Sequence, residues 1–146
     1  MSDTLKVEVV DWHQQQDRLK AIRKSVFIDE QHVPKELEWD GQDAGCTQFL
    51  ASLNSTPVAT ARLTSQGQIG RMAVLGDFRD RGIGSRLLKT VLDQAQREGH
   101  EQVFLHAQVN VINFYEKHGF VAEGDVFVDA GIDHISMRLR FTGSNR

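Results

Sequence analysis

Two arginines and two glycines lie within six residues, from Arg79 to Gly84, directly before a segment with helical periodicity. The unpaired N–H groups and the dipole at a helix N-terminus favour a bound anion, and glycine lets an oxyanion approach the backbone closely. Arg79 and Arg81 would add positive charge beside such an anion. The segment therefore indicates a phosphate-binding turn, and an ordinary helix start with two glycines is the alternative.

A second candidate for chemistry is Tyr115, the only tyrosine of the chain, within the segment from Asn113 to Phe120. An unperturbed phenol has a pKa near 10, so it is protonated at neutral pH and can donate its proton to a leaving group. By spacing alone, the same residue also fits as an aromatic side chain packed in a core beside Phe114.

The elements that would position these residues alternate between strand and helix patterns. Apolar residues recur at helical spacing from Leu19 to Val26 and from Ile83 to Ala95, where Gly99 fits as the C-terminal cap. A short helix is expected at Ile112–Lys117. Strands are expected at residues 5–10, 47–53, 58–64, 69–75, 103–107, 120–128 and 135–141, with a turn at 129–133.

The connections between these elements indicate how they are arranged. Short turns join the three strands between residues 47 and 75, which predicts antiparallel hairpins. The strand 69–75, the long helix and the strand 103–107 predict a crossover with a parallel pair. We therefore expect a mixed α/β fold in a single domain that spans residues 1–146.

The composition is that of a soluble globular protein, with 40% apolar residues, 25% charged residues and a net charge of −3. The negative charge argues against a nucleic-acid partner. The sequence contains no run of 18 apolar residues, so no membrane span is expected. Cys46 is the only cysteine and no zinc-type Cys/His spacing occurs, so neither an internal disulfide nor a metal is expected. These features favour a cytoplasmic protein.

The turn from Arg79 to Gly84 resembles the Arg/Gln-x-x-Gly-x-Gly/Ala turn of the GNAT superfamily of N-acetyltransferases. The segment from Asn113 to Phe120 resembles the second signature of that family, and it follows about 30 residues later, in the family's order. Residues 26–40 and 127–134 are similar to the ElaA-like subgroup. The resemblance implies the GNAT acyl-CoA N-acyltransferase fold, with a mixed, mostly antiparallel twisted sheet of about seven strands, a splayed parallel pair and about four flanking helices.

By this resemblance, the chain moves the acetyl group of acetyl-CoA directly to a primary amine. The pantetheine arm is expected along the splayed strand, whose backbone N–H groups would bind the oxyanion. Tyr115 would be the general acid for the leaving thiolate, and Gln108 stands where many members have an asparagine that contacts the cofactor. The expected cofactor-binding residues are Met72, Ala73, Val74, Arg79, Arg81, Gly82, Ile83, Gly84, Ser85 and Gln108.

Glu30 is the first candidate for the general base, on the condition that burial raises the pKa of its carboxyl group. A solvated carboxylate at a helix end is the alternative. His106 could also serve, and His32 and His134 are further candidates. Cys46 has no evident base partner in the sequence, which argues against a covalent acetyl-cysteine mechanism.

Charged residues outside these signatures have two interpretations. Four carboxylates lie close together and could attract a cationic amine or form a solvated loop: Glu36, Glu38, Asp40 and Asp43. Arg62 and Arg71 lie on predicted strands, where charge is unusual, and Arg71 could face the acceptor cleft.

The expected acceptor is a small molecule, and a protein N-terminus or a lysine is the close alternative. A non-catalytic acyl-CoA-binding sensor would keep the glycine turn but would not need Tyr115 or a base. A different phosphorylated ligand at the turn is a third alternative. The final strand pair could support a homodimer.

Overall fold

Seven strands form one sheet, in the order β1-β2-β3-β4-β5-β7-β6, in the computed structural model, which describes residues 3–142. Neighbouring strands are antiparallel except β4 and β5, which run parallel as predicted. The strands are β1 (Leu5–Val10), β2 (Thr47–Leu53), β3 (Thr56–Leu63), β4 (Gln68–Val74), β5 (Gln102–Gln108), β6 (Val121–Asp129) and β7 (Ile132–Arg140). The predicted mixed α/β fold with a parallel pair is therefore confirmed.

Four α-helices accompany the sheet: α1 (Trp12–Arg23), α2 (Lys35–Glu38), α3 (Ile83–Arg97) and α4 (Ile112–Lys117). The Asp11 carboxylate caps α1 by accepting a hydrogen bond from the Gln14 N–H at 3.0 Å. At its other end α1 continues into a π-helical segment, η1 (Lys24–Glu30), and Pro34 then precedes α2. Single turns of π-helix are frequent at functional sites, and η1 lies beside the cavity described below.

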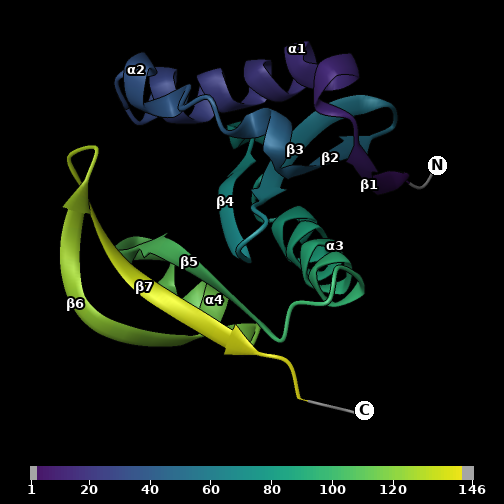
Figure 1. Cartoon of the computed structure of the whole chain (residues 1–146). Coiled ribbons are helices and arrows are strands. Elements are labelled where there is room, and N and C mark those ends of the chain that lie inside the picture. The colour runs from purple at the N-terminus through teal and green to yellow at the C-terminus, as the bar shows by residue number, and fades with distance from the viewer. Residues whose placement is uncertain (1–2, 143–146) are drawn as a thin grey trace.

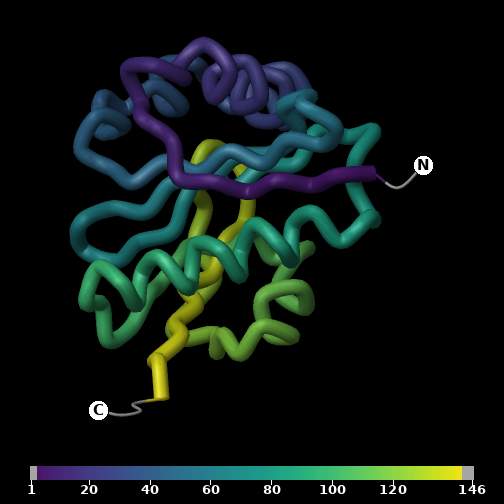
Figure 2. Tube along the Cα trace, turned by 90° about the vertical axis from the view of Figure 1, so that its right-hand side faces the viewer, coloured from purple at the N-terminus to yellow at the C-terminus, as the bar shows by residue number. Residues whose placement is uncertain are grey.

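The helices cover both faces of the sheet (Figures 1 and 2). On one face, Leu19 and Ile22 of α1 and Val26 of η1 pack on Leu50 and Ala73. On the other face, α3 contributes the apolar stripe predicted from its sequence, and α4 packs beside it. The buried side chains of that stripe are Ile83, Leu87, Leu88, Val91 and Ala95. No helix within residues 3–142 is long and apolar enough to cross a membrane.

The turn between the last two strands is shorter than predicted. We expected residues 129–133 to form it, but only Ala130 and Gly131 lie between β6 and β7. Both have positive φ, at 53° and 77°. A two-residue turn with both φ values positive matches the twist of the strands, so the pairing continues up to Asp129 and Ile132.

The sheet opens between β4 and β5. Their pairing covers only Gln68 with Phe104 and Ile69 with Leu105, after which the two strands separate. On the other side of β4, the register against β3 shifts between Thr60 and Arg62, which places a bulge at Arg71 and Met72. Figure 1 shows β4 bending away from β5, with the amino-terminal and carboxy-terminal strands on either side of the opening.

Candidate active site

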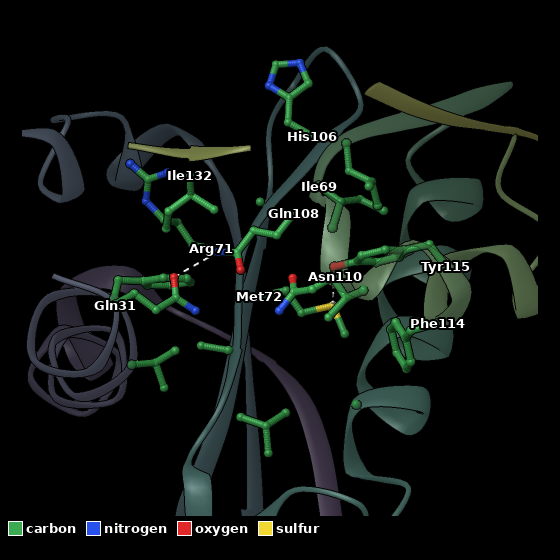
Figure 3. A pocket seen from close by; sticks show the side chains of 18 of the residues that line it. Gln31, Ile69, Arg71, Met72, His106, Gln108, Asn110, Phe114, Tyr115 and Ile132 are labelled. Carbon is green, nitrogen blue, oxygen red and sulfur yellow. Dashed lines mark hydrogen bonds between the residues drawn. The ribbon is translucent and has the colours of Figure 1, made fainter. Parts of the chain in front are cut away.

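A cavity of about 790 Å³ occupies the opening between β4 and β5. Its walls come from β4, the end of β5, η1, the first turn of α3, α4 and the β6–β7 turn. Figure 3 shows Met72, Tyr115 and Asn110 near its centre, with Phe114 beside α3 and Gln31 on the opposite wall. Segments from both signatures of the sequence therefore line one cavity.

Among the residues that the structure describes, 3–142, no strand pairs with the edge of β4 that faces this cavity. Leu75 donates its N–H to the Val58 carbonyl at 2.9 Å, so that residue points its backbone groups toward β3. Because these groups alternate along an antiparallel pair, Ala73 also faces β3, whereas Met72 and Val74 face the opening. Backbone donors and acceptors that no strand satisfies are available to a ligand.

The glycine turn has the geometry of an anion-binding helix start. Gly82 caps α3 with φ at 79° and no side-chain cap, and the first intrahelical bond runs from the Arg86 N–H to the Gly82 carbonyl. The N–H groups of Ile83, Gly84 and Ser85 therefore have no helical acceptor. A Cβ at Gly84 would lie 3.5 Å from the Phe114 ring, which is an ordinary van der Waals distance, so the packing against α4 would also admit alanine.

Side chains around the turn have different surroundings. The Ile83 side chain is buried in the core, so only its backbone can reach an anion. Ser85 Oγ lies 3.1 Å from His118 Nε2. Arg81 is not among the residues that line the cavity, and its guanidinium lies over the Phe78 ring, 5.4 Å from the centroid. An extended anion would therefore have to leave the cavity along the turn in order to reach Arg81.

Glu30 does not meet the condition set for a general base. Its side chain is 47% exposed, and its two oxygens accept hydrogen bonds from Arg79 Nη1 and Nη2, both at 2.7 Å. These bonds from Arg79 hold the pKa of Glu30 below its usual range, and the small burial does not offset them. The raised pKa on which Glu30 depended as a candidate base is therefore absent, and its role as base stays a prediction.

Arg79 is engaged by the protein itself. Besides the pair with Glu30, its Nε donates to the Val74 carbonyl at 2.9 Å, at the open edge of β4. The hydrogen bond to Glu30, followed by the charges of Glu30 and Asp80, raises the pKa of Arg79 despite partial burial. Arg79 thus joins η1 to β4 beside the cavity, an arrangement that the sequence did not reveal.

Tyr115 points its hydroxyl group into the cavity (Figure 3). Its ring packs against Phe114 and Phe120, with centroids 5.1 and 5.8 Å away, and its hydroxyl lies 3.9 Å from Met72 Sδ. Burial raises the pKa of Tyr115 to about 12. The hydroxyl is therefore protonated at neutral pH, and thioether sulfur is only a weak acceptor for it.

Gln108 reaches across the opening to the amino-terminal half of the molecule. Its Nε2 donates to Gln31 Oε1 at 2.9 Å, a bond between the end of β5 and the residue after η1 (Figure 3). These residues are 77 positions apart in sequence. Gln108 lines the cavity, and its contact with the cofactor stays a prediction.

The histidine candidates are held at the edges of the cavity or outside it. His106 lines the cavity, but its ring packs edge-on against Phe127 at 5.1 Å and points away from Met72 and Tyr115 in Figure 3. His134 Nδ1 lies 2.7 Å from the Ile132 carbonyl oxygen. His32 is not among the lining residues.

The acidic stretch forms a buried ionic cluster, which neither sequence interpretation predicted. The Arg23 side chain is 1% exposed and contacts Glu38 Oε2 at 2.7 Å and Asp43 Oδ1 at 2.6 Å. Arg62 pairs with the same Asp43, and also with Asp40. We use the term ionic cluster for Arg23, Glu38, Asp40, Asp43, Arg62 and Arg71.

The carboxylates of the ionic cluster differ in their proton affinity. Burial raises the pKa of Glu38 despite three neighbouring arginines. Burial also acts to raise the pKa of Asp40, but hydrogen bonds from the Arg62 guanidinium and the Gln42 N–H outweigh it and bring the value to about 2. The cluster pairs three cations with three carboxylates, so it presents no net negative charge to attract an amine.

Comparison with known proteins agrees with this geometry. Residues 9–141 match the family model described as the acetyltransferase (GNAT) domain. The uncharacterized N-acetyltransferase YjcF of Bacillus subtilis is 32% identical over 120 residues, which cover 80% of this chain and 86% of that relative.

Two solved structures show the same fold across the chain. The structure of Escherichia coli ElaA matches with a TM-score of 0.85 and 26% identity, and the match covers 94% of this chain and 100% of the ElaA chain. An acyl-CoA N-acyltransferase from Pseudomonas aeruginosa has a TM-score of 0.79 and 28% identity, covering 94% of this chain and 99% of that one.

The fold and these matches define an acyltransferase enzyme. Within that class, the chain belongs to the GNAT acetyltransferase family and is ElaA-like.

Proposed function

We propose that this enzyme transfers the acetyl group of acetyl-CoA directly to the primary amine of a small molecule. The observation that carries the proposal is one continuous cavity, in which the open edge of β4 at Met72 and Val74 leads to the unpaired N–H groups after Gly82. Backbone amides along an extended edge suit the pantetheine arm, and the helix start suits the pyrophosphate.

The reaction forms a C–N bond and breaks a C–S bond. The amine nitrogen attacks the thioester carbonyl, the tetrahedral oxyanion forms, and the CoA thiolate then leaves. The unpaired N–H groups of the β4 edge are the donors for the oxyanion. In this proposal, no metal takes part.

Tyr115 acts on the leaving sulfur as a hydrogen-bond donor. A phenol with a pKa of about 12 is a weaker acid than an ordinary thiol, whose pKa is about 8.5, so full proton transfer to the thiolate runs uphill. A hydrogen bond to the sulfur still stabilises its developing charge. The proton that finally neutralises the thiolate then comes from the ammonium group formed when the amine attacks.

In this proposal, no enzyme side chain removes a proton from the acceptor amine before it attacks. Because Glu30 is paired with Arg79 and His106 points away from the centre, we infer that the amine enters in its neutral form. The value of kcat/KM should then rise about tenfold per pH unit up to the pKa of the acceptor amine. The pH profile should show no second inflection from the titration of an enzyme carboxylate.

Titration calorimetry with acetyl-CoA, followed by a thiol-release screen of amines, amino acids, polyamines and peptides, tests this function. Binding with thiol release that depends on an amine is the expected result. Absence of binding to any acyl-CoA would refute the proposal, and binding without release for any amine would favour the acyl-CoA sensor. A cytoplasmic location, the absence of a nucleic-acid or membrane partner, and a homodimer remain predictions.

A further inference from the structure

Arg71 occupies a strained position beside the open edge of β4. It lies in the β-bulge and has φ at +49°, the left-handed region that is unfavourable for any residue with a Cβ. Strain of this kind persists where the surrounding structure fixes it, and it is concentrated at functional sites. Arg71 is the immediate neighbour of Met72, whose backbone faces the opening, so its side chain starts next to the expected position of the thioester.

The guanidinium group of Arg71 is fixed by two of its three nitrogens. Nη2 donates to the carbonyls of Leu37 and Glu38 at 3.1 Å each and lies 3.2 Å from Asp40 Oδ2. Nε is buried and forms an ion pair with Glu38 Oε2 at 3.2 Å, although it makes no hydrogen bond to the described residues. Among residues 3–142, Nη1 has no hydrogen-bond acceptor, while the side chain is 25% exposed and lines the cavity.

Apolar side chains accompany Arg71 at this end of the cavity. Leu37 is 52% exposed although it is a large hydrophobic residue, and it lines the cavity together with Val33 and Ile132. Figure 3 shows Arg71 beside Ile132, on the side away from Tyr115 and Phe114. This end therefore combines a positioned guanidinium N–H pair with an apolar wall.

We propose that the acceptor is an amino acid with an apolar side chain, whose carboxylate binds Nη1 of Arg71 and whose amine then faces the open edge of β4. The inference rests on the proposed acetyl transfer and names its substrate class. A carboxylate is the partner that a fixed guanidinium edge binds best, and the balanced charges of the ionic cluster give no advantage to a polycation. Val33, Leu37 and Ile132 would then contact the apolar side chain.

A matched acceptor series tests the substrate class in the wild-type enzyme. Leucine, leucinamide and 3-methylbutylamine share one side chain and differ only in the carboxylate, and the phenylalanine set repeats the comparison. Each kcat/KM is corrected for the neutral fraction of the amine, because the three amines have different pKa values. We expect the amino acid to exceed the plain amine by roughly tenfold or more, as for one charge-assisted hydrogen bond.

Two variants separate binding of the carboxylate from a structural effect. Arg71→Lys keeps the positive charge but loses the planar edge, so the ratio of leucine to 3-methylbutylamine should fall at least tenfold while acetyl-CoA affinity stays the same. Arg62→Lys makes the same change within the ionic cluster, at a residue that shares Asp40 with Arg71 but is not among those lining the cavity, and should leave the ratio within about twofold.

The possible failures are distinct. Equal corrected rates for the amino acid and the plain amine in the wild type would refute the inference and leave acetyl transfer intact, as would a preference for the amide. If the protein binds acetyl-CoA but no member of the series gives thiol release, the substrate class is refuted. If the wider amine screen also gives no thiol release, the proposed acetyl transfer is refuted as well. The wild-type series decides the matter even if Arg71→Lys does not fold.

Discussion

The ionic cluster and the opening between β4 and β5 meet at Arg71, which belongs to the cluster and lines the cavity. The two regions differ in how far their polar groups are paired within the protein. In the cluster, Arg23, Glu38, Asp43 and Arg62 are almost fully buried and pair with one another, while Asp40 and Arg71 are partly exposed. In the opening, the Val74 carbonyl accepts a hydrogen bond from Arg79, but within residues 3–142 the N–H groups of the β4 edge and of the first turn of α3 have no partner strand or helical acceptor. Most charged side chains of the ionic cluster thus pair with one another, and the opening offers backbone N–H groups and the one free edge of Arg71 to a ligand.

The strongest test of this contrast is Gly82→Glu, which places a carboxylate where the pyrophosphate is expected. Like charges in contact cost several kcal/mol, so acetyl-CoA affinity should fall at least about a hundredfold in titration calorimetry. Gly99→Glu is the matched control, because Gly99 also has positive φ, at 90°, and follows the opposite end of α3. Equal affinities for wild type and Gly82→Glu would remove the turn from the binding site.

The second test breaks the ionic cluster. Asp43→Asn leaves two buried arginines, Arg23 and Arg62, without their shared carboxylate, which should lower the free energy of unfolding by about 3 kcal/mol. Glu36→Gln, an exposed change in the same segment, should shift it by less than about 0.5 kcal/mol. Urea denaturation measures both, and an unchanged midpoint for Asp43→Asn would show that the cluster is not structural.

The pH dependence of stability sharpens the same point. The pKa of Asp40 is about 2 in the folded protein and 3.8 ordinarily, so its contribution is complete above about pH 5 and is lost as the pH falls toward 2. The stability difference between wild type and Asp40→Asn should therefore shrink as denaturation is repeated at pH 6, 4 and 3. A difference that is constant over this range would contradict the pairing with Arg62.

Tyr115→Phe tests the one side-chain group proposed to act at the sulfur. Loss of a hydrogen bond to a charged atom should lower kcat roughly tenfold to a hundredfold, with acetyl-CoA affinity unchanged because the ring packing is retained. Met72→Leu removes the present partner of the hydroxyl at similar volume, and it should change kcat only slightly. A normal kcat for Tyr115→Phe would exclude the role.

The smallest effect is expected for Glu30→Gln. An exposed ion pair contributes little, so kcat/KM should change less than about fivefold and its pH profile should keep its shape. Asp29→Asn, which removes a neighbouring exposed carboxylate paired with Lys24, is the control. A hundredfold loss of kcat confined to Glu30→Gln would restore Glu30 as the general base.

Local patterns explain why much of the fold could be predicted. The apolar stripe from Ile83 to Ala95 depends on residues within a few positions of one another. The turn at Ala130 and Gly131 was placed in the right segment but made too long, since the pairing of Ile132 with Asp129 depends on the partner strand. Strand alternation could not tell where β4 bulges, because Arg71 is held there by Leu37, Glu38 and Asp40.

By its residues alone, the sequence determined the glycine turn at Gly82, the position of Tyr115 after β5 and the α/β order that brings them to one sheet. The partner of each charged group was decided only by the tertiary structure. Glu30 meets Arg79 across 49 positions, and Gln31 meets Gln108 across 77. A glutamate is the same letter in the sequence whether its carboxylate is free or paired. Its pKa depends on which cation the fold brings within hydrogen-bonding distance. For that reason the cavity could be foreseen from the sequence, while the surroundings of the proposed base could not.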